Sequence, residues 1–387
     1  MIFKLSKKLQ SLPPYLFVEI DKAKRRAAAE GRDIIDLGIG DPDTPTPRHI
    51  IEALYQAALD PANHRYALDQ GMPALRATIE GWYKRRFNVN LNPDTEILPL
   101  IGSKEGIAHF PLGFLNAGDY SLVPDPCYPP YKGGTILAGG KPFLMPLCAA
   151  NGFLPNLKKI PANIRRSAKL LYINYPNNPT GATAENRFYR DVVEFAVRNK
   201  IIVISDLAYS EIAYDGYRPR SFLETQGAKD VGIEFHSLSK TYNMTGWRIG
   251  WACGNAKLIS ALAKVKSNID SGIFSAVQLA GIAALEGPQE HIGNMRNLYR
   301  ERRDALIRGL NSQGWQVTPP KATFYVWLKV FNRMDSIKFS KLLLEKANIV
   351  VTPGVGFGRH GEGYIRIALT VSRERIEEAV GRLKKIF

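Results

Sequence analysis

The chain has 387 residues, 45% of them hydrophobic, so it can bury a large core and we expect it to fold as two structural regions. Three scattered cysteines argue against a disulfide framework and a metal site. The absence of a long apolar run argues against a membrane span, and the absence of a signal-peptide pattern argues against secretion. We therefore expect a cytoplasmic protein. The net charge of +16 comes from basic residues spread without a compact run, which favours anionic small ligands over nucleic acid.

Short apolar runs alternate with longer helical patterns after a polar opening segment, which is typical of an α/β fold. Most of these runs are too apolar for half-exposed edge strands. We therefore expect a mostly parallel central sheet with flanking helices on both faces. The expected strands cover residues 96–101, 120–123, 170–174, 201–205, 232–237 and 249–253.

Apolar residues at helical spacing predict a helix over 184–199 and one or two long helices over 257–284. From about Pro288 the pattern changes to a charged helix, a strand, another helix and a final strand, which predicts a smaller α+β domain. The expected strands of this domain cover 323–329 and 363–369. We predict an N-terminal arm with part of the small domain over 1–45, a large domain over 46–287 and a C-terminal small domain over 288–387.

The most informative segment is SLSKTYNMTGWRIG, residues 237–250. A lysine amine is a nucleophile only when it is neutral, and burial or nearby positive charge lowers its pKa. The hydroxyl groups of Ser237 and Ser239 and the guanidinium of Arg248 could form an anion-binding cup around Lys240. Taken alone, Lys240 could also be a solvated lysine in a Ser/Thr loop.

An acidic residue, Asp206, ends the expected strand over 201–205, and Tyr209 follows three residues later. Ligands of open α/β sheets lie outside the carboxyl ends of the strands, so this carboxylate should face a ligand. Near a pyridine nitrogen it would keep that nitrogen protonated and strengthen the ring as an electron sink. The alternative is that Asp206 caps a helix.

Two further loops follow expected strands. The first, YPNNPTG at 175–181, is made rigid by its prolines and carries Asn178, whose amide can donate a hydrogen bond. The second, GSKE at 102–105, opens a helical segment to Leu115 that Pro111 should kink. Free backbone N–H groups at such a helix start bind phosphate.

In this order, GSKE, YPNNPTGA, DLAY and SLSKTYNMTGWRIG resemble the class I/II aminotransferases over nearly the whole chain. The resemblance implies the aspartate-aminotransferase fold, which is fold type I of the enzymes that depend on pyridoxal 5'-phosphate. Within this family, LGIGDPDTPTP, IGSKEGIAHFPLGF and GEGYIRIALT are most similar to LL-diaminopimelate aminotransferases.

The resemblance also implies site residues. Lys240 would hold the cofactor and carry a proton, Asp206 would pair with the pyridine nitrogen, and Tyr209 would hold the phenolic oxygen. The implied cofactor-binding residues are Tyr66, Ser103, Lys104, Tyr128, Asn178, Asp206, Tyr209, Ser237, Ser239, Lys240 and Arg248, with Tyr66 supplied by the second subunit of a homodimer. The implied substrate-binding residues are Tyr15, Gly40, Asp69, Lys104, Tyr128, Asn178 and Arg366, of which Arg366 would bind the α-carboxylate. The Asn178–Pro179 bond would be cis, as in the family.

The implied reaction interconverts LL-diaminopimelate and 2-oxoglutarate with tetrahydrodipicolinate and glutamate in lysine biosynthesis. Asp69 stands where plant-type enzymes of this group carry glutamate, and 268–275 differs from their pattern. We expect Asp69 to meet the second ammonium group of diaminopimelate; a solvated loop acid is the alternative. A broad-specificity aspartate, alanine or aromatic aminotransferase and a cysteine-sulfur β-lyase remain alternatives. A DNA-binding regulator is disfavoured, because no helix-turn-helix pattern precedes the catalytic region.

Overall fold

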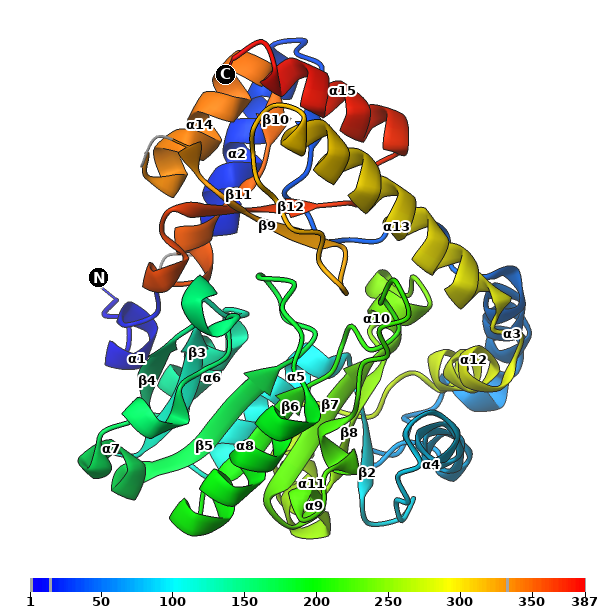
Figure 1. Ribbon diagram of the computed structural model, residues 1–387. Coiled ribbons are helices and arrows are strands. Elements are labelled where there is room, and N and C mark those ends of the chain that lie inside the picture. Colours follow the sequence, from blue (N-terminus) through cyan, green and yellow to red (C-terminus); the bar gives the residue numbers. More distant parts are fainter. Residues whose placement is uncertain (1–2, 14–15, 332–333, 387) are drawn as a thin grey trace.

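A seven-stranded sheet, called here the large sheet, forms the centre of the computed structural model, which describes residues 3–13, 16–331 and 334–386 (Figure 1). In spatial order its strands are β2 (Ile97–Leu100), β8 (Gly250–Gly254), β7 (Gly232–Ser237), β6 (Ile202–Asp206), β5 (Ala168–Asn174), β3 (Tyr120–Asp125) and β4 (Lys141–Pro146). Only β8 runs antiparallel to its neighbours, β2 and β7, while the other pairs are parallel. The predicted α/β architecture with a mostly parallel sheet is confirmed.

Apolar side chains cover both faces of the large sheet. Along β5, Leu170 and Tyr172 belong to one core cluster, and Leu171 and Ile173 belong to the other, as the two-residue period of a strand requires. Helix α8 (Asn186–Asn199) packs on β6, and Figure 1 shows it in front of the sheet, with α5 (Ser103–His109) behind. The other helices near this sheet are α6 (Pro130–Leu137), α7 (Ala162–Ser167), α9 (Ala228–Val231), α10 (Leu238–Thr241) and α11 (Ala256–Lys266).

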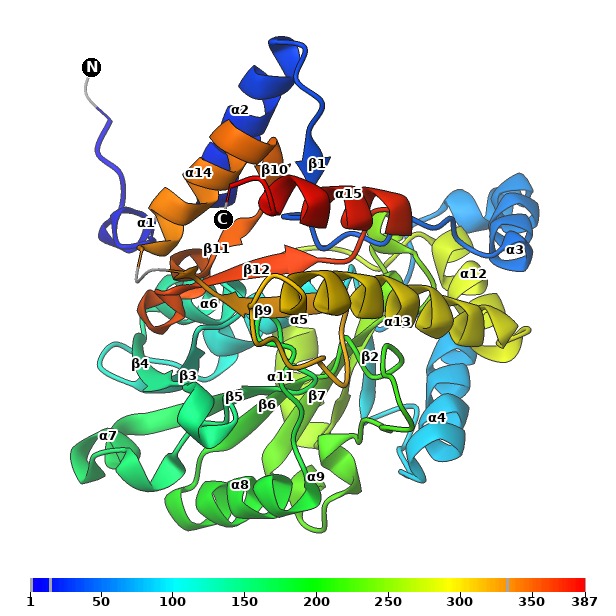
Figure 2. The ribbon, with the colours of Figure 1, turned by 45° about the horizontal axis from the view of Figure 1, so that its top comes forward.

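A three-stranded antiparallel sheet, called here the small sheet, has the order β11 (Thr352–Pro353), β12 (Tyr364–Ala368) and β9 (Tyr325–Lys329). Figures 1 and 2 show it above the large sheet, among α2 (Leu16–Ala29), α13 (Glu290–Asn311), α14 (Ser336–Ala347) and α15 (Arg373–Leu383). The N-terminal segment joins this region, because β1 (Ile35–Asp36) pairs with β10 (Ile349–Val350) and the Ala368 amide donates to the Leu37 carbonyl (2.7 Å).

The predicted helical stretch over 257–284 forms two helices, α11 and α12 (Ser275–Glu286), separated by a loop. Helix α12 packs against α3 (Arg48–Leu59) and α4 (Pro73–Phe87), and α1 (Lys7–Gln10) lies near the N-terminus. None of the helices in the described part of the chain is long and apolar enough to cross a membrane.

Some local features agree with the sequence-based predictions and others differ. Helix α5 ends at His109 and continues as a 3-10 turn that contains Pro111, as the proline predicted. The Asn178–Pro179 bond is cis, as expected. The strand expected over 323–329 begins only at Tyr325, because Thr323 has a φ of 67° and cannot extend the strand. Strands β1, β4, β10 and β11 were not predicted.

Candidate active site

A cavity of about 440 Å³ lies where the carboxyl ends of β5, β6 and β7 face the small sheet. Most of the predicted site residues line it: Gly40, Ser103, Lys104, Tyr128, Asn178, Asp206, Tyr209, Ser237, Ser239, Lys240, Arg248 and Arg366. Tyr15 lies outside the described residues. Six further residues that were not predicted from the sequence also line the cavity, namely Pro129, Asn174, Ala208, Thr245, Tyr325 and Phe357.

Lys240 lies in the short helix α10, directly after β7. The side chain of Ser237 accepts a hydrogen bond from the Ser239 amide (3.1 Å) and so starts this helix. The Lys240 amine donates to the Gly40 carbonyl (2.8 Å). Burial lowers the pKa of Lys240 to about 8, which leaves about a tenth of the amine neutral at pH 7. Because the side chain lines the cavity and its amine bonds to a backbone carbonyl, Lys240 is not the solvated surface lysine of the alternative interpretation.

Asp206 is the last residue of β6 and is buried. One carboxylate oxygen, Oδ2, accepts a hydrogen bond from the Tyr131 hydroxyl (2.7 Å), while Oδ1 is buried without a hydrogen-bond partner among the described residues. Burial raises the pKa of Asp206 to about 6, and the Tyr131 hydroxyl opposes this shift. No helix begins at Asp206, so it is not a helix cap. An unpaired buried acceptor in a cavity fits a ligand that carries an N–H group.

A chain of hydrogen bonds links Asp206 to the small sheet. The Asn174 side chain donates to the Asp206 carbonyl (2.7 Å) and accepts from the Asn178 amide (2.8 Å). The Asn178 side-chain oxygen accepts from Arg366 Nη1 (2.9 Å), and Arg366 Nη2 donates to the Gly38 carbonyl (2.8 Å). Arg366 is thus a buried, oriented guanidinium at the cavity wall, which suits recognition of a carboxylate.

Aromatic rings enclose this arginine. Its guanidinium carbon lies 4.2 Å from the centroid of the Tyr325 ring and 4.7 Å from that of Phe357. The Tyr325 and Tyr209 hydroxyls are 3.1 Å apart. A Cβ atom at Gly40 would collide with the Tyr325 hydroxyl, so glycine is required there for the two segments to approach. These contacts link the ends of β6 and β9 across the cavity.

Several groups that can bind an anion gather on the side of the cavity formed by the start of α5 and the residues after β7. Gly102 has a φ of 76°, and a Cβ atom there would collide with the guanidinium of Arg248. Arg248 itself has a φ of 57°, a conformation that costs an L-residue about 1 to 2 kcal/mol. With Ser103, Lys104 and Ser239, this arginine forms a site of the composition that phosphate groups favour.

Two predicted site residues lie away from this cavity. Tyr66 is 95% exposed. Asp69 is half-buried in a separate crevice together with Arg76 and Lys264. Both were expected to serve the neighbouring subunit of a dimer, so their position outside the chain's own cavity leaves that role as a prediction.

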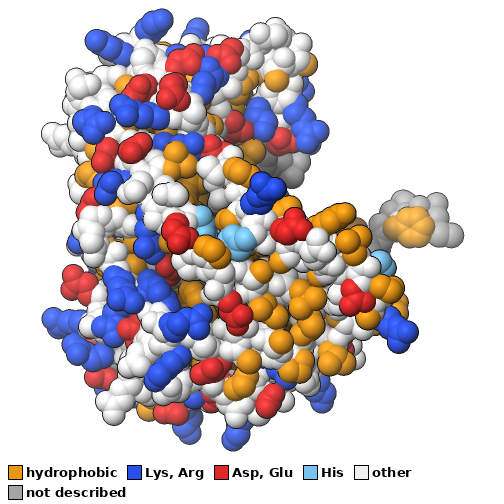
Figure 3. Space-filling model, turned by 90° about the vertical axis from the view of Figure 1, so that its right-hand side faces the viewer, with side chains coloured by type: hydrophobic (Ala, Val, Ile, Leu, Met, Phe, Trp, Pro, Cys, Tyr) orange, Lys and Arg blue, Asp and Glu red, His pale blue; other side chains and the backbone are white. Residues whose placement is uncertain are grey.

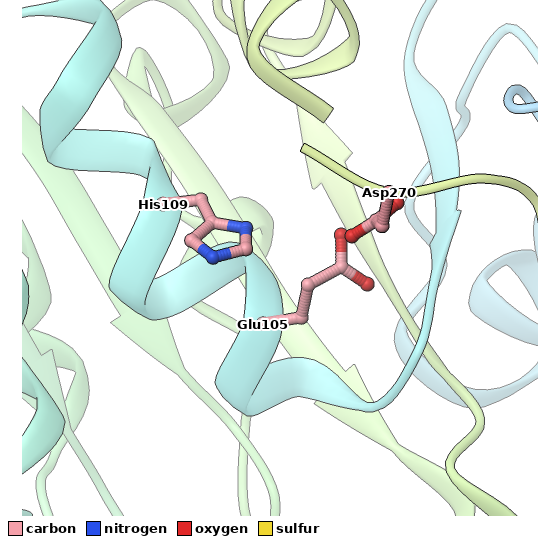
Figure 4. A group of neighbouring side chains, drawn as sticks. All are labelled: Glu105, His109 and Asp270. Carbon is pink, nitrogen blue, oxygen red and sulfur yellow. The ribbon is translucent and has the colours of Figure 1, made fainter. Parts of the chain in front are cut away.

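A half-buried polar cluster lies at α5, where side-chain atoms of Glu105, His109 and Asp270 come within 4.8 Å of one another (Figure 4). Such a group could hold a metal ion. However, the buried ammonium of Lys266 donates to Glu105 Oε1 (3.2 Å), to the Ser271 carbonyl (3.1 Å) and to the carboxylate of Asp270. The lysine therefore supplies the positive charge that these carboxylates need, and we interpret the cluster as a structural ion-pair network.

The family model for aminotransferase class I and II matches residues 32–383, so the chain belongs to this family. Enzymes of the family depend on pyridoxal phosphate. Curated LL-diaminopimelate aminotransferases from Moorella thermoacetica and Desulforudis audaxviator are each 56% identical, over 98% and 99% of this chain and 98% of each relative.

Solved structures of aminotransferases and related proteins have the same fold as this chain. A substrate-bound BacF structure from Bacillus subtilis has a TM-score of 0.95 and 40% identity, and covers 100% of this chain and 98% of that one. A variant of Thermus thermophilus aspartate aminotransferase has a TM-score of 0.94 and 28% identity over 100% of both chains. The expected aspartate-aminotransferase fold and the resemblance to class I/II aminotransferases are confirmed.

Proposed function

We propose that this chain is an LL-diaminopimelate aminotransferase that moves an amino group between LL-diaminopimelate and 2-oxoglutarate. One observation supports the reaction type: the same cavity contains Lys240, with its lowered pKa, the unpaired oxygen of Asp206 and the oriented guanidinium of Arg366. The names of the curated relatives support the choice of substrate.

Pyridoxal 5'-phosphate, the cofactor of the family, would supply an electron sink for the reaction. The buried Asp206 oxygen fits its pyridine N–H, and the Ser103, Lys104, Ser237, Ser239 and Arg248 side chains fit its phosphate. Tyr128 would cover the ring, and Tyr209 with Asn178 would donate to its phenolic oxygen. The pairing of Asp206 with a cation would also offset the cost of burying this carboxylate.

Arg366 would bind the substrates, and Lys240 would transfer protons during the reaction. All amino acid and 2-oxo acid substrates carry an α-carboxylate, and the guanidinium can bind it with two parallel hydrogen bonds. The Lys240 amine, with a pKa of about 8, can take up the proton that the α-carbon of the amino donor loses, and it can deliver a proton to the α-carbon of the acceptor in the other half of the reaction. Gly40 and Tyr15 would complete the substrate side of the cavity.

We further propose that two chains associate and share their active sites, since aminotransferases of this family are typically dimeric. The face that carries α3 and α12 shows a broad area of hydrophobic side chains (Figure 3). The exposed apolar residues of this region include Ile51, Tyr55, Leu59, Leu68 and Phe274. In the dimer, Tyr66 would reach the partner's phosphate site and Asp69 the distal end of its substrate. The predicted arm and two domains, 1–45, 46–287 and 288–387, would together frame each site.

The proposal is tested by incubating the purified protein with LL-diaminopimelate and 2-oxoglutarate, alongside meso-diaminopimelate, aspartate and alanine. We expect glutamate formation with the LL isomer and little with the others. Equal rates with aspartate or alanine would indicate a broad-specificity aminotransferase instead. Release of pyruvate from cystathionine without glutamate formation would indicate a β-lyase.

A further inference from the structure

Asp125, the last residue of β3, joins the large sheet to the segment 354–361, which follows β11. Its carboxylate is fully buried and accepts three hydrogen bonds. The donors are the Lys132 amine (2.5 Å), the His360 backbone amide (3.1 Å) and the His360 ring nitrogen Nδ1 (2.6 Å). This carboxylate, buried where the large sheet contacts the segment 354–361, thus receives two of its three hydrogen bonds from one residue, His360.

The backbone around this contact is arranged for close approach. The Cys127 amide donates to the Phe357 carbonyl (3.0 Å), which is a second link between the same two segments. Gly358 has a φ of 143°, and a Cβ atom there would collide with the Asp125 carboxylate and approach Lys132 Nζ to 2.6 Å. Only glycine allows the segment to lie directly on the carboxylate.

The docked segment also forms a wall of the active-site cavity. Phe357 lines the cavity, and its ring lies 4.7 Å from the Arg366 guanidinium carbon, which also lies 4.2 Å from the Tyr325 ring. The segment leaves β11 directly beside this arginine, because Thr352 of β11 pairs with Arg366 of β12. Movement of residues 354–361 away from β3 would therefore remove one of the two rings that hold the guanidinium.

We propose that Asp125 and His360 are positioning residues that hold Phe357 against Arg366 and so set the α-carboxylate end of the active site. The inference rests on the proposed role of Arg366. Neither Asp125 nor His360 lines the cavity, so they would act through Phe357.

This arrangement has a distinctive kinetic consequence. Every amino acid and 2-oxo acid substrate presents the same α-carboxylate, whatever its side chain. Loss of the contact should raise KM by the same factor for all of them, and it should leave kcat nearly unchanged because Lys240 and Asp206 are not displaced. Mutation of a residue that contacts the substrate side chain would change KM for some substrates only.

The test compares three variants of the holoenzyme, His360→Ala, His360→Asn and Arg359→Ala, with glutamate, 2-oxoglutarate and LL-diaminopimelate as substrates. Each half-reaction is followed over a range of substrate concentrations, so that its half-saturation constant serves as KM and its limiting rate as kcat. His360→Ala should raise KM about tenfold for all three substrates, since couplings between residues in contact are of this order. His360→Asn should restore KM to within about twofold, because the asparagine amide can donate from nearly the position of Nδ1. Arg359, the exposed neighbour in the same turn, is the matched control and should have no effect.

An unchanged KM in folded His360→Ala, an increase confined to diaminopimelate, or a fall in kcat alone would each overturn the inference. If His360→Ala does not fold, Lys132→Met, which removes another donor to Asp125, should give the same uniform increase in KM. The ratios of variant to wild-type KM for glutamate and 2-oxoglutarate do not depend on which amino acid is the natural substrate. A wild-type enzyme that is inactive on LL-diaminopimelate but active on glutamate would overturn the proposed function and leave this inference standing.

Discussion

The Lys240 amine is a base whose pKa the fold has lowered to about 8, chiefly by burial, with Arg366 and Arg248 acting in the same direction and Asp41 opposing them. Since a lowered pKa makes the neutral form available at lower pH, uptake of pyridoxal phosphate by the apoprotein should accelerate with rising pH and level off above about 8. Stopped-flow absorbance over a pH series measures this. A rate that keeps rising to about pH 10, as for an unperturbed lysine, would contradict the assignment.

Asp206 provides a second prediction. Asp206→Asn keeps the shape of the side chain but cannot hold a positive charge on the pyridine nitrogen, so it should lower kcat by about a hundredfold or more. The melting temperature should change little, and the cofactor should remain detectable. Asp191→Asn, an exposed position on α8, is the control. Unchanged turnover in Asp206→Asn would show that this carboxylate has no part in the reaction.

The residues predicted from the sequence were those inside recognisable local motifs, such as Lys240 in SLSKTYNMTGWRIG and Asn178 in YPNNPTGA. Tyr131, Asn174, Tyr325 and Phe357 were missed as site residues. Their contributions depend on neighbours far along the chain: Tyr131 donates to Asp206, and Tyr325 and Phe357 enclose Arg366. No local pattern encodes such contacts, although Tyr131 follows Tyr128 closely in PDPCYPPY.

At the scale of elements, the turn between β2 and α5 makes the anion-binding cup. Gly102→Ala should weaken binding of pyridoxal phosphate by about tenfold or more, because the added methyl group displaces Arg248 and a charge-assisted hydrogen bond contributes roughly 1.5 to 3 kcal/mol. Gly118→Ala is the matched control, since Gly118 also has a positive φ (96°) but a Cβ atom there would meet nothing within 4 Å.

Cofactor titration of the two apoproteins measures this difference. Both variants should lose a similar free energy of unfolding, about 1 to 2 kcal/mol, from backbone strain alone. If Gly118→Ala weakened cofactor binding as much as Gly102→Ala does, the effect would be explained by backbone strain and not by the displacement of Arg248.

The interior strands of the large sheet could be predicted because each is a continuous apolar run. Strand β4 could not, since Lys141–Pro146 contains two prolines and is mostly half-buried. Strands β1, β10 and β11 have two residues each and exist only through long-range pairs such as Ile35 with Ile349. Their formation depends on the completed fold and leaves no periodic pattern in the sequence.

At the scale of the whole molecule, the proposed dimer makes Asp69 a specificity residue for the partner's substrate. Asp69→Asn should lower kcat/KM for LL-diaminopimelate roughly ten- to a hundredfold, the contribution of one charge-assisted hydrogen bond, and should barely affect glutamate, which lacks the second ammonium group. Asp69→Glu retains the charge and serves as the control. An equal loss of kcat/KM for both substrates would indicate a structural role, and no loss for either would mean that Asp69 is a solvated acid. A fully active monomer would refute the proposal that two chains share each active site.

Lys240 is the residue expected to bond to the cofactor, in the cavity between the large sheet and the small sheet. The most direct measurement is borohydride reduction of the protein with bound pyridoxal phosphate, followed by peptide mapping by mass spectrometry. We predict a single modified residue, Lys240, and no modification in Lys240→Ala, whose visible cofactor absorbance should also be lost. Modification of Lys104 or another lysine in place of Lys240, or an unchanged absorbance band in the variant, would contradict the account.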